Sequence, residues 1–163
     1  MEYLLETARA SETEAVFALY ADRIQWMNEN GIRQWNMTDY LQAYPKSYYQ
    51  RQQREGRLYV LKQNGRIAGA AVLLEQDERW PDSGITSAFY VHNLVTRSDA
   101  KGVDVLLLAQ AEALAKARGK RKMRLDCAVD NPFLNQYYEN LGYRPAGCCT
   151  DGPYEGNLRE KTL

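Results

Sequence analysis

Hydrophobic and polar residues alternate along the 163-residue chain with the two periods that are typical of helices and strands. Apolar positions at helical spacing predict a first helix, which follows the capping box Ser11–Glu14 and ends at Gly31. A second helix is expected to open at Pro45, and an amphipathic third helix is expected from Gly102 to Arg118. The residues expected on the inward face of this third helix are Val103, Leu106, Leu107, Ala113, Leu114 and Ala117.

Strands are predicted where apolar runs or period-two alternation occur. Residues 3–9 alternate weakly and predict the first strand. Residues 58–74 predict a hairpin, because two apolar runs flank Asn64-Gly65, a strong signal for a two-residue turn. The other strands are expected at residues 86–96, 123–129, 143–149 and 154–162. The predicted order of the elements is β-α-α-β-β-β-α-β-α-β-β, a mixture of strands and helices of the α/β class.

The segment from Arg124 to Tyr143 is the most informative part of the chain. Its first residues continue an alternating strand, and Asn131 then stands as a favourable N-cap before Pro132 at the first helical position. One apolar helical face follows, and Gly142 supplies the left-handed residue that ends the helix. The pattern predicts a strand, one short helix and a further strand.

This segment closely resembles the C-terminal core of the GCN5-related N-acetyltransferases, the GNAT superfamily. The resemblance rests on the Arg124-Leu-Asp strand, Asn131, the pair Tyr138-Glu139 and the sequence Leu-Gly-Tyr143. It is good from residue 58 to residue 145 and weak before residue 58, where that family varies its substrate-binding helices.

The resemblance implies the GNAT fold, as one acetyltransferase domain over residues 1–163. That fold has a central, twisted, mixed and mostly antiparallel sheet of about seven strands, flanked by about four helices. A V-shaped splay between the fourth and fifth strands is expected with it.

The resemblance also implies a reaction, in which the acetyl group of the cosubstrate acetyl-CoA passes to a primary amine by direct attack. In the family, the tyrosine at the position of Tyr138 faces the sulfur of acetyl-CoA. Tyr138 is therefore the candidate general acid and a candidate cofactor contact, and core packing within its helix is the alternative. The thioester carbonyl is bound in the family by a backbone N–H at a bulge on the fourth strand. Here that place falls within residues 93–96, so Leu94, Val95 and Thr96 are expected to bind the cofactor.

In the family, the pyrophosphate of acetyl-CoA lies at the start of the central helix. The loop there reads Gln or Arg, two residues, Gly, one residue, and Gly or Ala. Residues 99–104 align with it: Gly102 matches, whereas Asp99 and Asp104 place acids beside a site for an anion. A carboxylate ~6 Å from a phosphate charge costs about 1–3 kcal/mol. The residues expected to bind the cofactor here, together with Asn131 further along, are Lys101, Gly102, Val103 and Asp104.

Two interpretations of these acids remain open. In the first, Asp104 is a helix-start residue that faces solvent and stabilises the helix. In the second, the CoA site has decayed, and the chain is a non-catalytic binding or regulatory protein with the same fold. Asn131 is likewise open to a simple capping role in place of a cofactor contact.

No general base is evident from the sequence, and His92, the only histidine, is the candidate. It is expected to share a strand face with Tyr90 and Leu94, and simple packing is the alternative. Asp126 and a water relay are other candidates for moving the proton.

The acceptor is expected to bind to Trp35, which lies in an aromatic loop, and to Tyr90. The acidic loop at residues 75–82 either attracts a cationic acceptor, such as a polyamine or aminosugar, or is a solvated turn. The expected partner is thus a small-molecule or peptide amine, and a homodimer is possible because dimers are common in the family.

Composition narrows the cellular setting. Lys plus Arg and Asp plus Glu both number 21, and this zero net charge argues against nucleic-acid and membrane-surface partners. The three cysteines, Cys127, Cys148 and Cys149, have no metal-ligand spacing, so no metal is expected. The chain shows neither a signal-peptide pattern nor an apolar run of membrane-spanning length. A cytoplasmic location is therefore expected.

Overall fold

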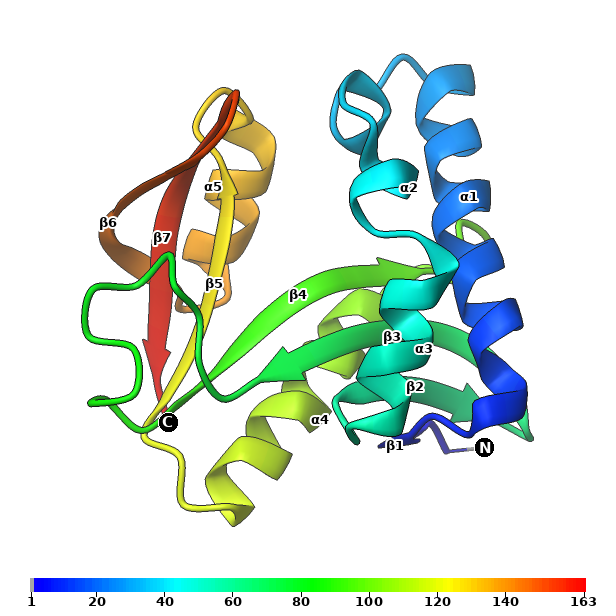
Figure 1. Ribbon diagram of the computed structural model, residues 1–163, viewed down its shortest axis with the longest axis horizontal. Coiled ribbons are helices and arrows are strands. Elements are labelled where there is room, and N and C mark those ends of the chain that lie inside the picture. The colour runs from blue at the N-terminus through cyan, green and yellow to red at the C-terminus, as the bar shows by residue number, and fades with distance from the viewer. Residues whose placement is uncertain (1) are drawn as a thin grey trace. The chain divides into compact units, whose positions relative to one another are not determined.

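The computed structural model describes residues 2–163, and these residues form a seven-stranded mixed sheet with five α-helices (Figure 1). The strands are β1 (Leu4–Thr7), β2 (Leu58–Gln63), β3 (Arg66–Leu74), β4 (Ala88–Thr96), β5 (Lys122–Ala128), β6 (Arg144–Asp151) and β7 (Tyr154–Thr162). The helices are α1 (Thr13–Glu29), α2 (Tyr40–Ala43), α3 (Lys46–Arg54), α4 (Val103–Ala117) and α5 (Pro132–Asn140). The predicted α/β class and sheet are confirmed, and α2 is a short helix that the sequence did not indicate.

The strands follow the order β1-β2-β3-β4-β5-β7-β6 across the sheet. The pairs β1–β2, β2–β3, β5–β7 and β6–β7 are antiparallel, whereas β4 and β5 are parallel. The parallel ladder joins Ala88–Tyr90 to Lys122–Arg124, at the beginning of both strands. Within the described residues the ladder stops there, although both strands continue.

Contacts divide the chain into two compact units. The first unit consists of Met1–Leu73 and Asn93–Ala111, and the second consists of Leu74–His92 and Glu112–Leu163. The expectation of a single domain over the whole chain stays a prediction.

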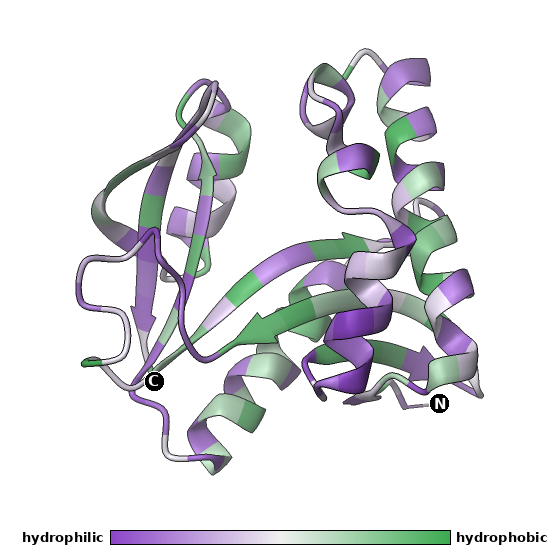
Figure 2. Ribbon diagram, viewed as in Figure 1, coloured by the Kyte–Doolittle hydropathy of each residue, from purple (hydrophilic) through white to green (hydrophobic). Residues whose placement is uncertain are grey.

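The first unit contains the predicted hairpin, formed by β2 and β3. Asn64 and Gly65 have φ of 51° and 76°, which are the left-handed values that a tight two-residue turn needs. In Figure 2, β3 is largely hydrophobic and α3 is largely hydrophilic. This contrast fits the burial of the central residues of β3, Ala68 and Ala70 to Leu73.

The start of α1 differs from the prediction, because Ser11 is not its cap. Ser11 lies within a 3-10 turn at Ala10–Glu12, and α1 begins at Thr13. The carboxylate of Glu12 accepts a hydrogen bond from the backbone N–H of Arg9 at 2.9 Å, and it also pairs with the buried ammonium of Lys62. A buried lysine needs such a partner, so the ion pair fixes Glu12 as the capping acid.

The inward face of α4 was predicted only in part. Val103 and Leu107 are buried as expected, but Leu106 is 42% exposed. The other buried residues of the helix are Leu108, Ala111 and Ala115. The buried stripe thus advances mainly in steps of four residues and presents small alanines inward, a choice that hydrophobicity alone does not reveal.

The second unit confirms the predicted strand, helix and strand around residues 124–143. The side chain of Asn131 caps α5 by accepting a hydrogen bond from the N–H of Leu134 at 3.0 Å, and Gly142 has φ of 93°. Asn135 connects α5 to β7, because its side-chain amide oxygen accepts hydrogen bonds from the side chains of Asn157 and Arg159.

The three cysteines are free. Cys127 and Cys149 are buried as expected for packing residues, whereas Cys148 is exposed. Among residues 2–163, no helix combines the length and the apolar character needed to cross a bilayer.

Gly69 of β3 tests the packing of the first unit. A Cβ atom at this position would lie 3.0 Å from the side chains of Leu107 and Thr96 and 3.0 Å from the backbone oxygen of Val95. Because a backbone oxygen cannot rotate away, Gly69→Ala is expected to lower the free energy of unfolding by about 1–3 kcal/mol. Urea denaturation measures the change, and an unchanged midpoint would contradict the close approach of α4 to the sheet.

Candidate active site

A backbone irregularity interrupts β4 at Asn93. This residue has φ of 54°, a left-handed value that is rare for any residue other than glycine within a strand. It lies where the resemblance predicts a bulge, and Leu94, Val95 and Thr96 follow it in the first unit. That His92 and Leu94 share a strand face stays a prediction.

The end of β4 is held by Arg23 of α1. Its guanidinium donates to the backbone oxygen of Thr96 at 2.5 Å and to the hydroxyl of Thr96 at 3.2 Å. Burial lowers the pKa of Arg23, and the charge of Asp104 partly opposes that shift. Asp104, the unexpected acid at the start of α4, therefore acts on a cation of α1.

The second unexpected acid, Asp99, also has an arginine partner. The guanidinium of Arg97 donates to its carboxylate at 2.5 Å, and this hydrogen bond lowers the pKa of Asp99. Gly102 has φ of 76°, and Lys101 beside it is exposed. Both acids of the predicted pyrophosphate loop thus act on nearby cations, which weakens their repulsion of an anion.

A cavity of about 310 Å³ lies beside this loop in the first unit. Leu19, Asp22 and Arg23 line it from α1, and residues 96–99 line it from the loop. Of the residues that are predicted to bind the cofactor, Thr96 lines this cavity.

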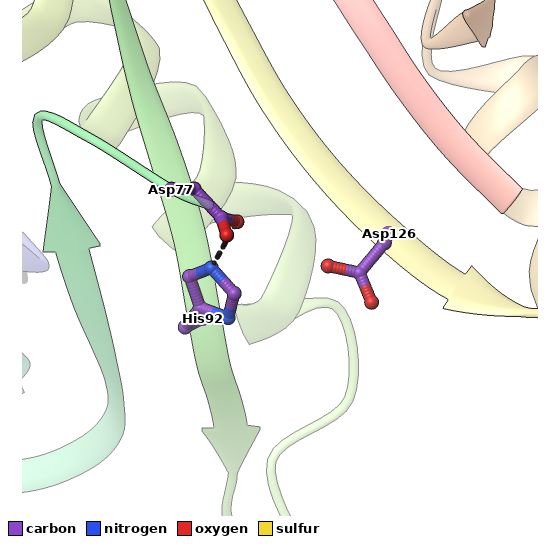
Figure 3. Close-up of side chains that lie close together, drawn as sticks. All are labelled: Asp77, His92 and Asp126. Atoms are coloured by element: carbon purple, nitrogen blue, oxygen red, sulfur yellow. Dashed lines mark hydrogen bonds and ion pairs between the residues drawn. The ribbon is translucent and has the colours of Figure 1, made fainter. Parts of the chain in front are cut away.

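The second unit holds His92 in a defined orientation. Its Nε2 lies 2.7 Å from a carboxylate oxygen of Asp77, as Figure 3 shows. Burial raises the pKa of Asp77, but the hydrogen bond and charge of His92 and the N–H of Arg79 outweigh burial and lower it. An ionised carboxylate only accepts, so Nε2 of a neutral His92 carries the proton and Nδ1 presents the lone pair.

Asp126 of β5 faces this pair (Figure 3). Its carboxylate accepts a hydrogen bond from the hydroxyl of Tyr154 at 2.6 Å and pairs with the guanidinium of Arg79 at 3.3 Å. Arg79 also pairs with Asp151 at 2.8 Å. Burial, followed by the charge of Asp126, raises the pKa of Tyr154, so its hydroxyl remains a donor.

Asp77, His92 and Asp126 could in principle hold a metal ion, since one ligand atom from each lies within 4.8 Å of the others. Asp77 already accepts from the imidazole, and the cationic Arg79 already neutralises Asp126. A metal ion would have to displace both contacts.

Arg124 anchors the loop at residues 75–87, although several of its residues are exposed. The buried guanidinium of Arg124 binds both carboxylate oxygens of Asp82, at 2.8 and 2.9 Å, and lies 4.3 Å from the ring centroid of Trp80. Trp80 itself is buried in a cluster with Tyr90 and Leu158. Two acids of this loop, Asp77 and Asp82, therefore have partners within the second unit, His92 and Arg124.

The two predicted acceptor residues lie in different units. Tyr90 is fully buried, and its hydroxyl accepts a hydrogen bond from Arg124 at 3.1 Å. Trp35 is half-buried in a 3-10 turn and stacks on Tyr40 with a ring separation of 4.5 Å. Their contacts with a substrate stay predictions, and for Tyr90 the observed contacts account for its burial without one.

Tyr138 lies in α5, in the second unit, with 9% of its surface exposed. Its ring packs edge-on against those of Tyr137 and Tyr143. The proposed acid role therefore stays a prediction, as does the cofactor contact of Asn131, whose capping role is confirmed. Sequence reasoning missed Asp77, because its importance comes from the folded loop and from no motif.

Comparison with known proteins identifies the class. Residues 26–143 match the model of the acetyltransferase (GNAT) family, so this chain belongs to that family. Membership implies acetylation that depends on acetyl-CoA.

Individual relatives are distant in sequence. A Bacillus subtilis (strain 168) protein described as the uncharacterized N-acetyltransferase YesJ is 24% identical over 148 residues, which cover 86% of this chain and 81% of that protein. A GNAT-family acetyltransferase structure from Listeria monocytogenes 4b F2365 has a TM-score of 0.84 at 23% identity and covers 100% of this chain and 96% of its own. The PaiA N-acetyltransferase from Thermoplasma acidophilum, solved with coenzyme A, has a TM-score of 0.73 at 17% identity and covers both chains completely. These structures support the fold.

The pair of Arg124 and Asp82 predicts a pH dependence of stability. The hydrogen bond from Arg124 holds the pKa of Asp82 well below its usual range. The contribution of a depressed pKa is full above the unfolded value of about 3.9, and it declines progressively as the pH falls from there towards the lower pKa of the folded state. Asp82→Asn is expected to lower the free energy of unfolding at pH 7 by about 1–2 kcal/mol, after discounting for solvent screening.

Urea denaturation of both chains between pH 3 and pH 7 checks this prediction. Asp130→Asn, at an exposed turn, is the control and should change little. A difference between Asp82→Asn and wild type that persists unchanged at pH 3 would contradict the assignment.

Proposed function

We propose that this chain transfers the acetyl group of acetyl-CoA to a primary amine of a small molecule or peptide by direct attack. The observation that carries the proposal is the hydrogen bond between His92 and Asp77, which gives the reaction an oriented base. The amine must attack in its neutral form, and for an amine with a pKa of ~10.4 deprotonation near pH 7 costs about 4–5 kcal/mol. A base close to the acceptor removes that proton at the point of reaction.

His92 is the base in this scheme. Asp77 holds Nε2–H, so Nδ1 accepts the proton of the acceptor ammonium, directly or through one water. Asp77 then stabilises the imidazolium that forms. The remaining carboxylate, Asp126, is occupied by Arg79 and Tyr154, which favours His92 over Asp126 as base.

The chemical step forms one bond and breaks one. The amine nitrogen attacks the thioester carbonyl, and backbone N–H groups among Leu94, Val95 and Thr96 stabilise the oxygen as it gains charge. The C–S bond then breaks, and the hydroxyl of Tyr138 donates its proton to the departing thiolate. A phenol suits this role because its pKa of about 10 exceeds that of a thiol, about 8.5, so it is protonated at rest. Solvent restores the proton to Tyr138.

The cofactor binds through its pyrophosphate to the N–H groups at the start of α4, at residues 101–104. Lys101 adds a positive charge. The pairing of Asp99 with Arg97, and the charge of Arg23 near Asp104, support a working site over a decayed one.

His92→Gln is expected to reduce kcat/KM for the amine about 100-fold, since glutamine fills the site without accepting the proton. Asp77→Asn should cost less, because His92 remains but its tautomer is no longer fixed. Asp130→Asn is the control, and a wild-type kcat/KM in His92→Gln would remove the base assignment.

Tyr138→Phe is expected to lower kcat about 10- to 100-fold while leaving the affinity for CoA unchanged, because only the proton for the thiolate is lost. Tyr137→Phe, on the same helix, is the matched control. CoA release is measured with spermidine, kanamycin and a peptide with a free N-terminus as acceptors. Unchanged turnover in Tyr138→Phe would exclude the acid role, and wild type that binds acetyl-CoA without releasing CoA would favour a non-catalytic binding protein.

A further inference from the structure

Three tyrosines from three different helices hold Asn93, and we call this group the Asn93 clamp. The hydroxyl of Tyr20, in α1, donates to the backbone oxygen of Asn93 at 2.5 Å. The hydroxyl of Tyr48, in α3, donates to its side-chain oxygen at 2.8 Å. The amide nitrogen of Asn93 donates in turn to the hydroxyl of Tyr40, in α2, at 2.6 Å. All four residues belong to the first unit.

The clamp supplies hydrogen-bond partners to a residue that has an unfavourable backbone conformation. A left-handed backbone costs roughly 1–2 kcal/mol for an ordinary L-residue, although asparagine visits it more readily than most. Such a conformation persists only where its surroundings determine it. The clamp binds the backbone oxygen and both polar atoms of the side chain, so the orientation of the peptide units around Asn93 is fixed.

The hydroxyls of the clamp are dependable partners. Tyr20 and Tyr40 are buried, and burial raises the pKa of both phenols. A raised pKa keeps these two phenols protonated near neutral pH, so both hydroxyls keep their hydrogen bonds there. The pattern of donors and acceptors around Asn93 is constant.

The clamp is also continuous with the predicted acceptor segment. Tyr40 stacks on Trp35 with 11° between the rings, and Tyr44 bridges the rings of Tyr40 and Tyr48 at 4.9 Å from each. The rings of Trp35, Tyr40, Tyr44 and Tyr48 therefore form one packed layer. Two of these tyrosines hydrogen-bond to Asn93.

We propose that Tyr40 and Tyr48 are positioning residues, which act through Asn93 to preorganise the backbone N–H groups of residues 94–96 for the thioester carbonyl. The inference rests on the proposed acetyl transfer, and it adds the residues that orient the carbonyl-binding N–H groups. Donors that are fixed before the reaction stabilise a developing charge without reorganising, and a displacement of 1 Å can cost roughly 100-fold in rate.

The test compares Tyr40→Phe and Tyr48→Phe with Tyr44→Phe. Tyr44 is the matched control, because its ring packs in the same layer while its hydroxyl makes no hydrogen bond within the described residues. Tyr40→Phe and Tyr48→Phe should each lower kcat about 10- to 100-fold with spermidine, kanamycin or the peptide, whichever wild type acetylates best. Their dissociation constants for CoA, which lacks the acetyl group and its thioester carbonyl, should stay within about twofold of wild type. Tyr44→Phe should match wild type in both measurements.

Amide hydrogen exchange gives a second readout that needs no turnover. Exchange at residues 94–96 should rise about tenfold in Tyr40→Phe, Tyr48→Phe and Asn93→Gly, and not in Tyr44→Phe. Asn93→Gly is informative because glycine adopts the same φ without strain but loses the side-chain bonds.

The outcomes separate the two proposals. Wild-type turnover and exchange in Tyr40→Phe and Tyr48→Phe, with an active wild type, overturn the clamp alone. A larger loss of CoA affinity than of kcat also overturns it, because the effect would then lie outside the carbonyl site. A wild type that releases no CoA with any of the three amines overturns acetyl transfer, and with it the catalytic role of the clamp.

Discussion

The left-handed backbone of Asn93 is the constraint around which the first unit is organised. A strand tolerates such a residue only where nearby groups satisfy its peptide units and side chain. Here α1, α2 and α3 each contribute one phenol to that task. These three helices lie in the segment that varies within the family, and each of them hydrogen-bonds to the same residue of the sheet. The segment that is expected to bind the acceptor is therefore connected to the strand that is expected to receive the thioester.

Charge pairing is the corresponding organising principle of the second unit. The loop at residues 75–87 is acidic, yet its acids bind specific cations or the imidazole: Asp82 binds the buried Arg124, and Asp77 binds His92. Arg79 of the same loop returns to Asp126 of β5. Each pair removes a desolvation penalty that its members would otherwise incur. The result is a carboxylate held against Nε2 of His92, which would fix the tautomer of the proposed general base.

Prediction from sequence succeeded where local chemistry determines structure. Asn64-Gly65 specified the hairpin because both residues tolerate positive φ, and Asn131 and Gly142 marked the ends of α5 because they satisfy its terminal backbone groups. It failed where a distant partner decides. Lys62 selected Glu12 over the expected capping box at Ser11, and the close approach to Gly69 selected the face of α4. The pair of His92 and Asp77 could not be predicted, because a loop anchored by Arg124 brings Asp77 into place.

The most direct test of this account is a crystal structure of the chain with bound acetyl-CoA. The account predicts that the carbonyl oxygen lies about 3 Å from a backbone nitrogen of residues 94–96. It also predicts that the pyrophosphate lies against the N–H groups of residues 101–104. An ordered acetyl-CoA whose carbonyl is bound elsewhere, with Asn93 still left-handed, would contradict the central claim that this strand backbone receives the thioester.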